Sequence, residues 1–281
     1  MSIASSRTTG GPSANGSPSS VITLRGRGAR VIRANVVRTG TGRPVAFLSG
    51  LVGLNEHWGE VASLVGDCLD CHLLELPLLG LRGEDCSVGG ATDLTIQYLE
   101  TNHSEAPILV GNSFGGHVAL RVALERPDLV RALVLAGSSG LLERTMMKDV
   151  QIRPSREWIA RKIGELFCDQ SKVSQSDLDR AYRVLNDRDN ARAMIRLSRT
   201  ARKNHLGDRI SQIHCPVLLI WGREDVVTPP EAAEQFLDLI PDSRIVWFDR
   251  CGHAPMIERP EEFGAALLEF ADELDQRERD Q

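Results

Sequence analysis

One serine of this chain has neighbours that could make it a nucleophile. Ser113 lies at the centre of GNSFG, residues 111–115, between an apolar run that ends at Val110 and an amphipathic stretch over Phe114–Glu125. A G-x-S-x-G between a strand and a helix holds the serine in a strained turn, with its hydroxyl exposed above the sheet. Glycine two positions before and after the serine avoids clashes in that turn. The pattern predicts Ser113 as a catalytic nucleophile.

A serine hydroxyl attacks a carbonyl only when a base accepts its proton. The chain has seven histidines. His253 follows the apolar run RIVWF, residues 244–248, and a four-residue loop, so we expect it at the carboxyl edge of a late strand. Because the carboxyl ends of parallel strands share one edge of a sheet, this position predicts His253 as the base that serves Ser113.

An acidic side chain is then needed to orient the imidazole and stabilise the imidazolium. Asp225 follows the apolar run PVLLIW, residues 216–221, and is the preferred candidate. Glu224 is the alternative, and Asp249 is a weaker one. With Asp225 as the acid, the three groups occur in the chain order Ser, Asp, His.

Backbone N–H groups could stabilise the oxyanion that forms when the serine attacks. The Phe114 amide is expected at a helix N-terminus, where partial positive charge favours an anion. The loop after the early apolar run PVAFL reads Ser-Gly-Leu, and the Leu51 amide is the second candidate, since Gly50 allows close approach. Each such donor is typically worth about 3 kcal/mol in the transition state.

Strand and helix patterns alternate along most of the chain, which predicts an α/β fold with a mostly parallel central sheet flanked by helices. The expected strands are 44–48, 72–76, 107–110, 132–136, 216–221 and 244–248, and the expected helices are 60–65, 91–99, 114–125, 231–239 and 261–274.

Residues 141–213 interrupt this alternation with helical periodicity and no clear strand. They predict a helical cap inserted between two late strands, with residues 21–140 and 214–281 as the core. Residues 1–20 are rich in Ser, Gly and Pro, which predicts a disordered tail.

Composition limits the classes of function. The net charge of −5 argues against general nucleic-acid binding, and apolar runs are too short to cross a bilayer. A small-molecule substrate is the expected partner, and the oligomeric state stays open.

Residues 1–55 carry seven Arg and no acidic residue. Such a start also occurs in organelle-targeting segments, so we expect a cytoplasmic protein while organellar import stays open. One CxxC, Cys68–Cys71, lacks the second pair of a closed zinc site, so no metal is expected.

The blocks VGNSFGG, WGREDVVTP and FDRCGHAPMIERPEEF resemble the α/β-hydrolase family over about residues 21–274. The sequences of these motifs are similar to those of the meta-cleavage-product hydrolases, which cut a carbon–carbon bond in ring-opened aromatic compounds. The resemblance implies a helical cap, no metal and no organic cofactor. Ser49 and Ala254 stand where many of these enzymes have His and Trp.

The resemblance also implies an arginine near the cap that binds the substrate carboxylate. The candidates are Arg192, Arg196, Arg199 and Arg202.

The predicted activity is hydrolysis of a small apolar carboxylic ester or related carbonyl compound through Ser113, His253 and Asp225. Asn112, Trp58 and Trp158 are further candidates for contact with the substrate. The alternatives are a carbon–carbon bond hydrolase that acts on dienoates, and a ligand receptor of the same fold with slow or no turnover.

Overall fold

A nine-stranded sheet forms the centre of the computed structural model, which describes residues 8–9, 19–143 and 154–280. The strands lie in the order β1-β2-β3-β5-β4-β6-β7-β8-β9. The first strands pair antiparallel through β5, and all pairs from β5–β4 to β8–β9 are parallel. The predicted α/β fold with a mostly parallel sheet is confirmed.

The strands β6 and β7 lie in the middle of the sheet, and every residue in them is buried. Their continuous apolar sequences are typical of parallel strands that are covered on both faces. The strand bounds are β1 Thr8–Thr9, β2 Ser19–Arg25, β3 Val31–Thr39, β4 Arg43–Leu48, β5 Leu69–Glu75, β6 Ile108–Asn112, β7 Ala132–Ala136, β8 Val217–Gly222 and β9 Ser243–Phe248.

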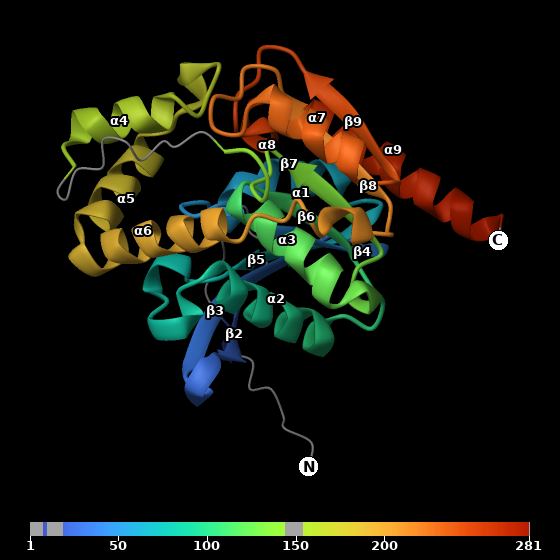
Figure 1. Ribbon diagram of the computed structural model, residues 1–281, viewed down its shortest axis with the longest axis horizontal. Coiled ribbons are helices and arrows are strands. Elements are labelled where there is room, and N and C mark those ends of the chain that lie inside the picture. The colour runs from blue at the N-terminus through green and yellow to red at the C-terminus, as the bar shows by residue number, and fades with distance from the viewer. Residues whose placement is uncertain (1–7, 10–18, 144–153, 281) are drawn as a thin grey trace.

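Helices cover both faces of the sheet and divide the core into two apolar clusters (Figure 1). The first cluster includes buried residues of α2, α3 and α7, and the second includes those of α1 and α9. The helix bounds are α1 Gly59–Val65, α2 Val88–Asn102, α3 Phe114–Glu125, α7 Pro230–Leu239, α8 Pro255–Glu258 and α9 Pro260–Arg279. No helix within the described ranges is both long enough and apolar enough to span a membrane.

The segment expected to form a cap contains α4 Arg156–Gly164, α5 Gln175–Asn186 and α6 Arg188–Lys203, which group together beside the sheet (Figure 1). Each is capped by a side chain that accepts a hydrogen bond from an amide of the first turn, and the accepting residues are Ser155, Ser174 and Asp187 respectively. Such caps satisfy amides that have no intrahelical partner. The described part of residues 141–213 contains no strand.

The tail expected over residues 1–20 differs from the structure at two places. Ser19 and Ser20 already belong to β2, and Thr8–Thr9 pairs with Ser20 and Val21 as β1. Hydrogen bonding between backbones therefore extends the sheet into residues 1–20, although this segment has few apolar side chains to bury. Residues 1–7 and 10–18 lie outside the described residues.

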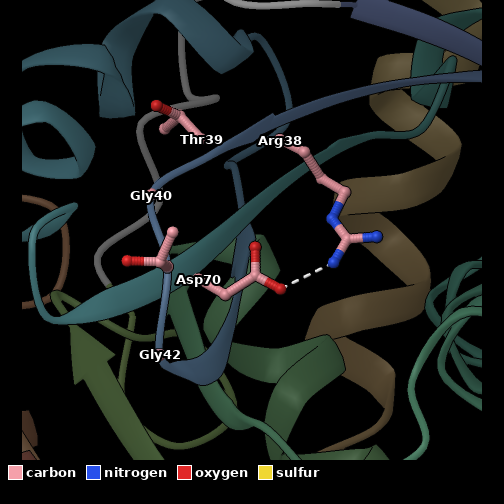
Figure 2. Close-up of a pocket in the computed structure, with 6 residues that line it drawn as sticks. Arg38, Thr39, Gly40, Gly42 and Asp70 are labelled. Atoms are coloured by element: carbon pink, nitrogen blue, oxygen red, sulfur yellow. Dashed lines mark hydrogen bonds and ion pairs between the residues drawn. The ribbon is translucent and has the colours of Figure 1, made fainter.

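A hollow of about 550 Å³ lies at the amino ends of β4 and β5 (Figure 2). Its lining includes Arg38, the turn Thr39–Gly42 and Asp70, and an Arg38 guanidinium nitrogen lies 2.6 Å from the Asp70 carboxylate. Ser113, Asp225 and His253 all follow carboxyl ends of strands, so this hollow belongs to the opposite edge of the sheet.

Candidate active site

The backbone at Ser113 has the strained conformation expected of a nucleophile turn. Its φ of 53° and ψ of −121° lie where residues other than glycine are rare. A Cβ on Gly111 would lie 2.6 Å from the Gly115 carbonyl oxygen, and one on Gly115 would lie 2.4 Å from that of Leu48. Glycine is therefore required on both sides of Ser113, as the sequence predicts.

The candidate oxyanion donors, the Phe114 and Leu51 amides, belong to segments that lie at or near this turn. Phe114 is the first residue of α3, so its N–H has no partner within the helix. The loop that carries Leu51 approaches the turn closely, because a Cβ on Gly50 would lie 3.4 Å from the Ser113 Cβ. This placement agrees with Phe114 and Leu51 as candidate donors.

Asp225 and His253 contact each other directly. The Asp225 Oδ2 lies 2.8 Å from His253 Nδ1. An ionised carboxylate only accepts hydrogen bonds, so Nδ1 carries the proton and Nε2 of the neutral ring is free to accept one. The carboxylate also accepts hydrogen bonds from the Val227 and Thr228 amides and from Thr228 Oγ1. These contacts fix both the carboxylate and the imidazole that it orients.

The surroundings of His253 favour its protonated form. Burial alone lowers the pKa of this imidazole, but the charge and hydrogen bond of Asp225 outweigh burial and leave the pKa above its ordinary value. Glu143 and Glu258 act in the same direction as Asp225. A base with these neighbours can hold the proton taken from a nucleophile, as general base catalysis requires.

The family model described as "Alpha/beta hydrolase family" matches residues 45–266, which is most of the chain. The chain belongs to the alpha/beta hydrolase family. It is a hydrolase enzyme, since its named relatives are hydrolases, esterases and carbon–carbon bond hydrolases.

Relatives of this hydrolase act on different bonds. A 2-hydroxy-6-oxo-6-(2'-aminophenyl)hexa-2,4-dienoic acid hydrolase of Metapseudomonas resinovorans is 32% identical over 169 residues, which are 58% of either protein and so less than two thirds of that relative. A pimeloyl-(acyl-carrier protein) methyl ester esterase of Nitrosomonas europaea is 28% identical and matches 82% of this chain and 96% of the esterase.

A solved structure gives a comparison of the whole fold. The alpha/beta hydrolase enzyme from the metagenome of lagoon sediments at Mar Chica, Morocco, superposes with a TM-score of 0.71 and 30% identity. The match covers 86% of this hydrolase and 96% of that chain.

The two other acidic candidates of the hydrolase lie away from the imidazole. Glu224 accepts a hydrogen bond from the Cys251 amide at 2.9 Å and so braces the loop before His253. Asp249 has an 81% exposed side chain and pairs with Arg223. Among these three acids, the structure brings Asp225 to His253.

Asn112 and Trp58, both candidates for contact with substrate, make structural contacts within the protein. The Asn112 amide nitrogen donates to the backbone oxygens of Ala136 at 2.9 Å and His253 at 3.0 Å, so it joins the nucleophile turn to the histidine loop. Trp58 is fully buried, and its indole N–H donates to Ser49 Oγ at 3.1 Å. Its ring supports the loop of Leu51 from within the core and offers no surface to a substrate.

Trp158 on α4 and the candidate arginines on α6 have contrasting positions. Trp158 is half-buried on α4, and its buried indole nitrogen has no hydrogen-bond partner among the residues described, so it stays a candidate for contact with substrate.

The four arginines that are candidates for binding a substrate carboxylate are all exposed, while the buried positions of α6 are Ala193, Leu197 and Ala201. Their helical spacing places the arginines on the outer face of α6, so they do not form part of the described site.

Three contributors to the site were not anticipated from the sequence. Thr228 holds the Asp225 carboxylate, and its place three residues after Asp225 is a local signal that could have indicated this role. Asp177 on α5 lies 3.1 Å from His57, in the loop that follows Leu51. Asp177 has no local sequence signal, because His57 lies 120 positions away. The buried Glu258 bonds the Gly252 amide six positions away, but its other partners, Cys168 and Asp169, lie about 90 positions away and could not be read from the local sequence.

Proposed function

We propose that this hydrolase cleaves a small apolar carboxylic ester through an acyl-enzyme intermediate. Ser113 Oγ attacks the carbonyl carbon while His253 Nε2 accepts the hydroxyl proton, and the Phe114 and Leu51 amides stabilise the oxyanion. His253 then gives the proton to the leaving alcohol oxygen. Water attacks the acyl-enzyme by the same route and releases the carboxylic acid.

The observation that carries the proposal is the 2.8 Å contact between Asp225 and His253, whose loop is bonded through Asn112 to the turn of Ser113. The contact sets the imidazole in the tautomer that can accept a proton from serine. The strained Ser113 backbone supports the same assignment, since such strain is typical of functional turns.

Helices α4 to α6 are proposed as the cap above this site. Arg180 of α5 donates to the Val52 carbonyl oxygen at 3.0 Å, directly after Leu51, and this contact supports a position over the oxyanion loop. The cap would then define the substrate pocket on the side away from the sheet.

A fluorophosphonate label tests the nucleophile, because it reacts with an activated serine. We expect the wild-type enzyme to be labelled and Ser113→Ala to remain unlabelled with an unchanged melting temperature. p-Nitrophenyl esters from acetate to dodecanoate would then give a chain-length optimum. Labelling and ester turnover by folded Ser113→Ala would overturn the assignment of the nucleophile.

Carbon–carbon bond hydrolysis is the second candidate, favoured by the relatives named as dienoic acid, nonadienedioate and nonatrienedioate hydrolases. Rapid loss of the visible absorbance of a dienoate, without comparable ester turnover, would favour this reaction. A shift in melting temperature with a ligand, but with neither labelling nor turnover, would instead favour a receptor.

A further inference from the structure

Glu258 is a buried acid that contacts two separate parts of the molecule. It ends the short helix α8, and only 3% of its surface is exposed. Its Oε2 accepts hydrogen bonds from the backbone amides of Cys168 at 2.8 Å and Asp169 at 2.9 Å. Its Oε1 accepts one from the Gly252 amide at 2.7 Å. One carboxylate therefore joins the turn after α4 to the residue before His253.

The two segments held by Glu258 also contact each other. The His253 amide donates to the Leu166 carbonyl oxygen at 2.7 Å. A Cβ on Gly252 would lie 2.5 Å from the same oxygen, so glycine is needed for this close approach. The turn Leu166–Asp169 and the histidine loop thus form one hydrogen-bonded unit with Glu258 at its centre.

The contacts at this position suit a side chain that only accepts hydrogen bonds from N–H groups. Three N–H groups point at the carboxylate, and within the described ranges Glu258 forms no ion pair with a Lys, Arg or His side chain. Charge-assisted hydrogen bonds from amides offset part of the cost of burying the charge. A glutamine would place an NH₂ donor against N–H donors at one end of the side chain.

We propose that Glu258 is a positioning residue that fastens the cap turn Leu166–Asp169 to the loop of His253, so that the imidazole takes its working place only when the cap is docked. This inference rests on the proposed function of His253 as the base. Glu258 acts through the backbone of Gly252 and His253 and does not touch the reacting atoms.

The main test compares Glu258→Gln with Glu261→Gln, an exposed acid in the first turn of α9 that undergoes the same change of charge. We expect Glu258→Gln to lower kcat by about tenfold to a hundredfold, because a small displacement of a catalytic group has effects of this size. KM should change less than kcat. The rate of fluorophosphonate labelling should fall with kcat, and Glu261→Gln should match the wild type.

The pH profile supplies a readout that loss of packing alone does not move. The charged groups that raise the pKa of His253 are Asp225, Glu143 and Glu258, so loss of the Glu258 charge lowers that pKa. The acid limb of kcat/KM should therefore move to lower pH in Glu258→Gln and stay in place in Glu261→Gln. A folded Glu258→Gln enzyme with wild-type kcat and pH profile would overturn the proposal.

Hydrogen exchange of the wild-type enzyme tests the same contacts if the Gln variant fails to fold. The amides of Cys168, Asp169 and Gly252 should exchange slowly, and Ser171, whose amide bonds the exposed Asp169 side chain, should exchange faster. Fast exchange at the three amides would overturn the proposed attachment. Absence of fluorophosphonate labelling in the wild type would instead refute the proposed function, and the exchange result would stand independently of it.

Discussion

The Asp225 carboxylate lies 2.8 Å from the His253 imidazole, although 28 positions separate the two residues in the chain. The contact arises because β8 and β9 are adjacent parallel strands that end together, with Gly222 opposite Phe248. Asp225 follows the first strand by three residues and His253 follows the second by five. Strand register therefore brings the two loops, and with them the acid and the base, to the same place.

Replacement of Asp225 by Asn tests this relationship. The amide no longer fixes the imidazole tautomer or stabilises the imidazolium, so we expect kcat to fall by roughly 10³- to 10⁴-fold. Asp249→Asn is the matched control, since its side chain is exposed and pairs with Arg223, and it should keep full activity. Steady-state ester hydrolysis measures both. Comparable losses in the two variants would contradict the role of Asp225.

Gly137 tests how closely the site is packed. It has a φ of +50°, and a Cβ there would lie 3.0 Å from Asp225 Oδ2 and 3.1 Å from His253 Nδ1. We expect Gly137→Ala to displace these groups and lower kcat by about tenfold or more. Gly28 is the control, because its φ is +72° and nothing lies within 4 Å of its Cβ. Gly28→Ala should cost about 1 kcal/mol in backbone strain while activity is retained.

Asn112 links the nucleophile turn to the histidine loop through the His253 backbone oxygen, and to the end of β7 through that of Ala136. Asn112→Ala leaves the His253 carbonyl oxygen without this partner, and we expect a loss of about 1–3 kcal/mol in the free energy of unfolding. We also expect kcat to fall, since the loop loses a restraint. Asn102→Ala, which removes a similar bond to the Tyr98 carbonyl oxygen on α2, should affect stability alone. Urea unfolding and kinetics distinguish the two, and wild-type kcat in Asn112→Ala would refute the link.

Asp177 connects α5 to the loop that follows the candidate oxyanion donor. Its Oδ1 lies 3.1 Å from His57 Nε2 and 3.2 Å from an Arg180 nitrogen, and the His57 hydrogen bond is the main cause that lowers the Asp177 pKa. We expect Asp177→Asn to weaken this attachment by about 1 kcal/mol and to raise KM severalfold. Asp179→Asn on the same helix serves as the control, since its exposed carboxylate pairs with Arg156 and accepts a hydrogen bond from Gln175 but does not contact His57. Equal KM values for the two variants would show that the attachment does not affect substrate binding.

Acid should destabilise the fold through histidines whose pKa is lowered by burial, which include the buried His72 and His117 and the half-buried His103. Burial lowers the pKa of His103 to about 4 and that of His117 to about 4, from an ordinary value of 6.5. In the unfolded chain these two histidines therefore become protonated below about pH 6.5, whereas in the folded chain they stay neutral until about pH 4. Within this window each histidine lowers the free energy of unfolding by at most about 1.4 kcal/mol per pH unit.

Urea unfolding at pH 7 and pH 5 measures this effect. We expect the midpoint to fall at pH 5 in the wild type and to fall less in His103→Gln, which lacks one of these groups. The exposed His214 is the control site, and His214→Gln should behave like the wild type. A midpoint that rises on going to pH 5, or equal changes in all three proteins, would contradict the linkage.

The sequence alone determined the features that depend on neighbouring residues. Helix α3 spans Phe114–Glu125 and strand β7 spans Ala132–Ala136, which are the predicted bounds. Gly111 also follows from the local turn, because a Cβ there would clash with Gly115 and Gly116, whereas Gly115 avoids a clash with Leu48 and Ser49 at the end of a neighbouring strand. Periodicity and turn chemistry suffice for such features, since the interactions that decide them are largely local.

Tertiary structure decided which residues meet across the site. It selected Asp225 over Glu224 and Asp249, and it placed Trp58 inside the core. It also brought Glu258 to the amides of Cys168 and Asp169, about 90 positions away in the chain. Such contacts depend on strand register and on how separate segments pack, and neither quantity is encoded in any short stretch of sequence.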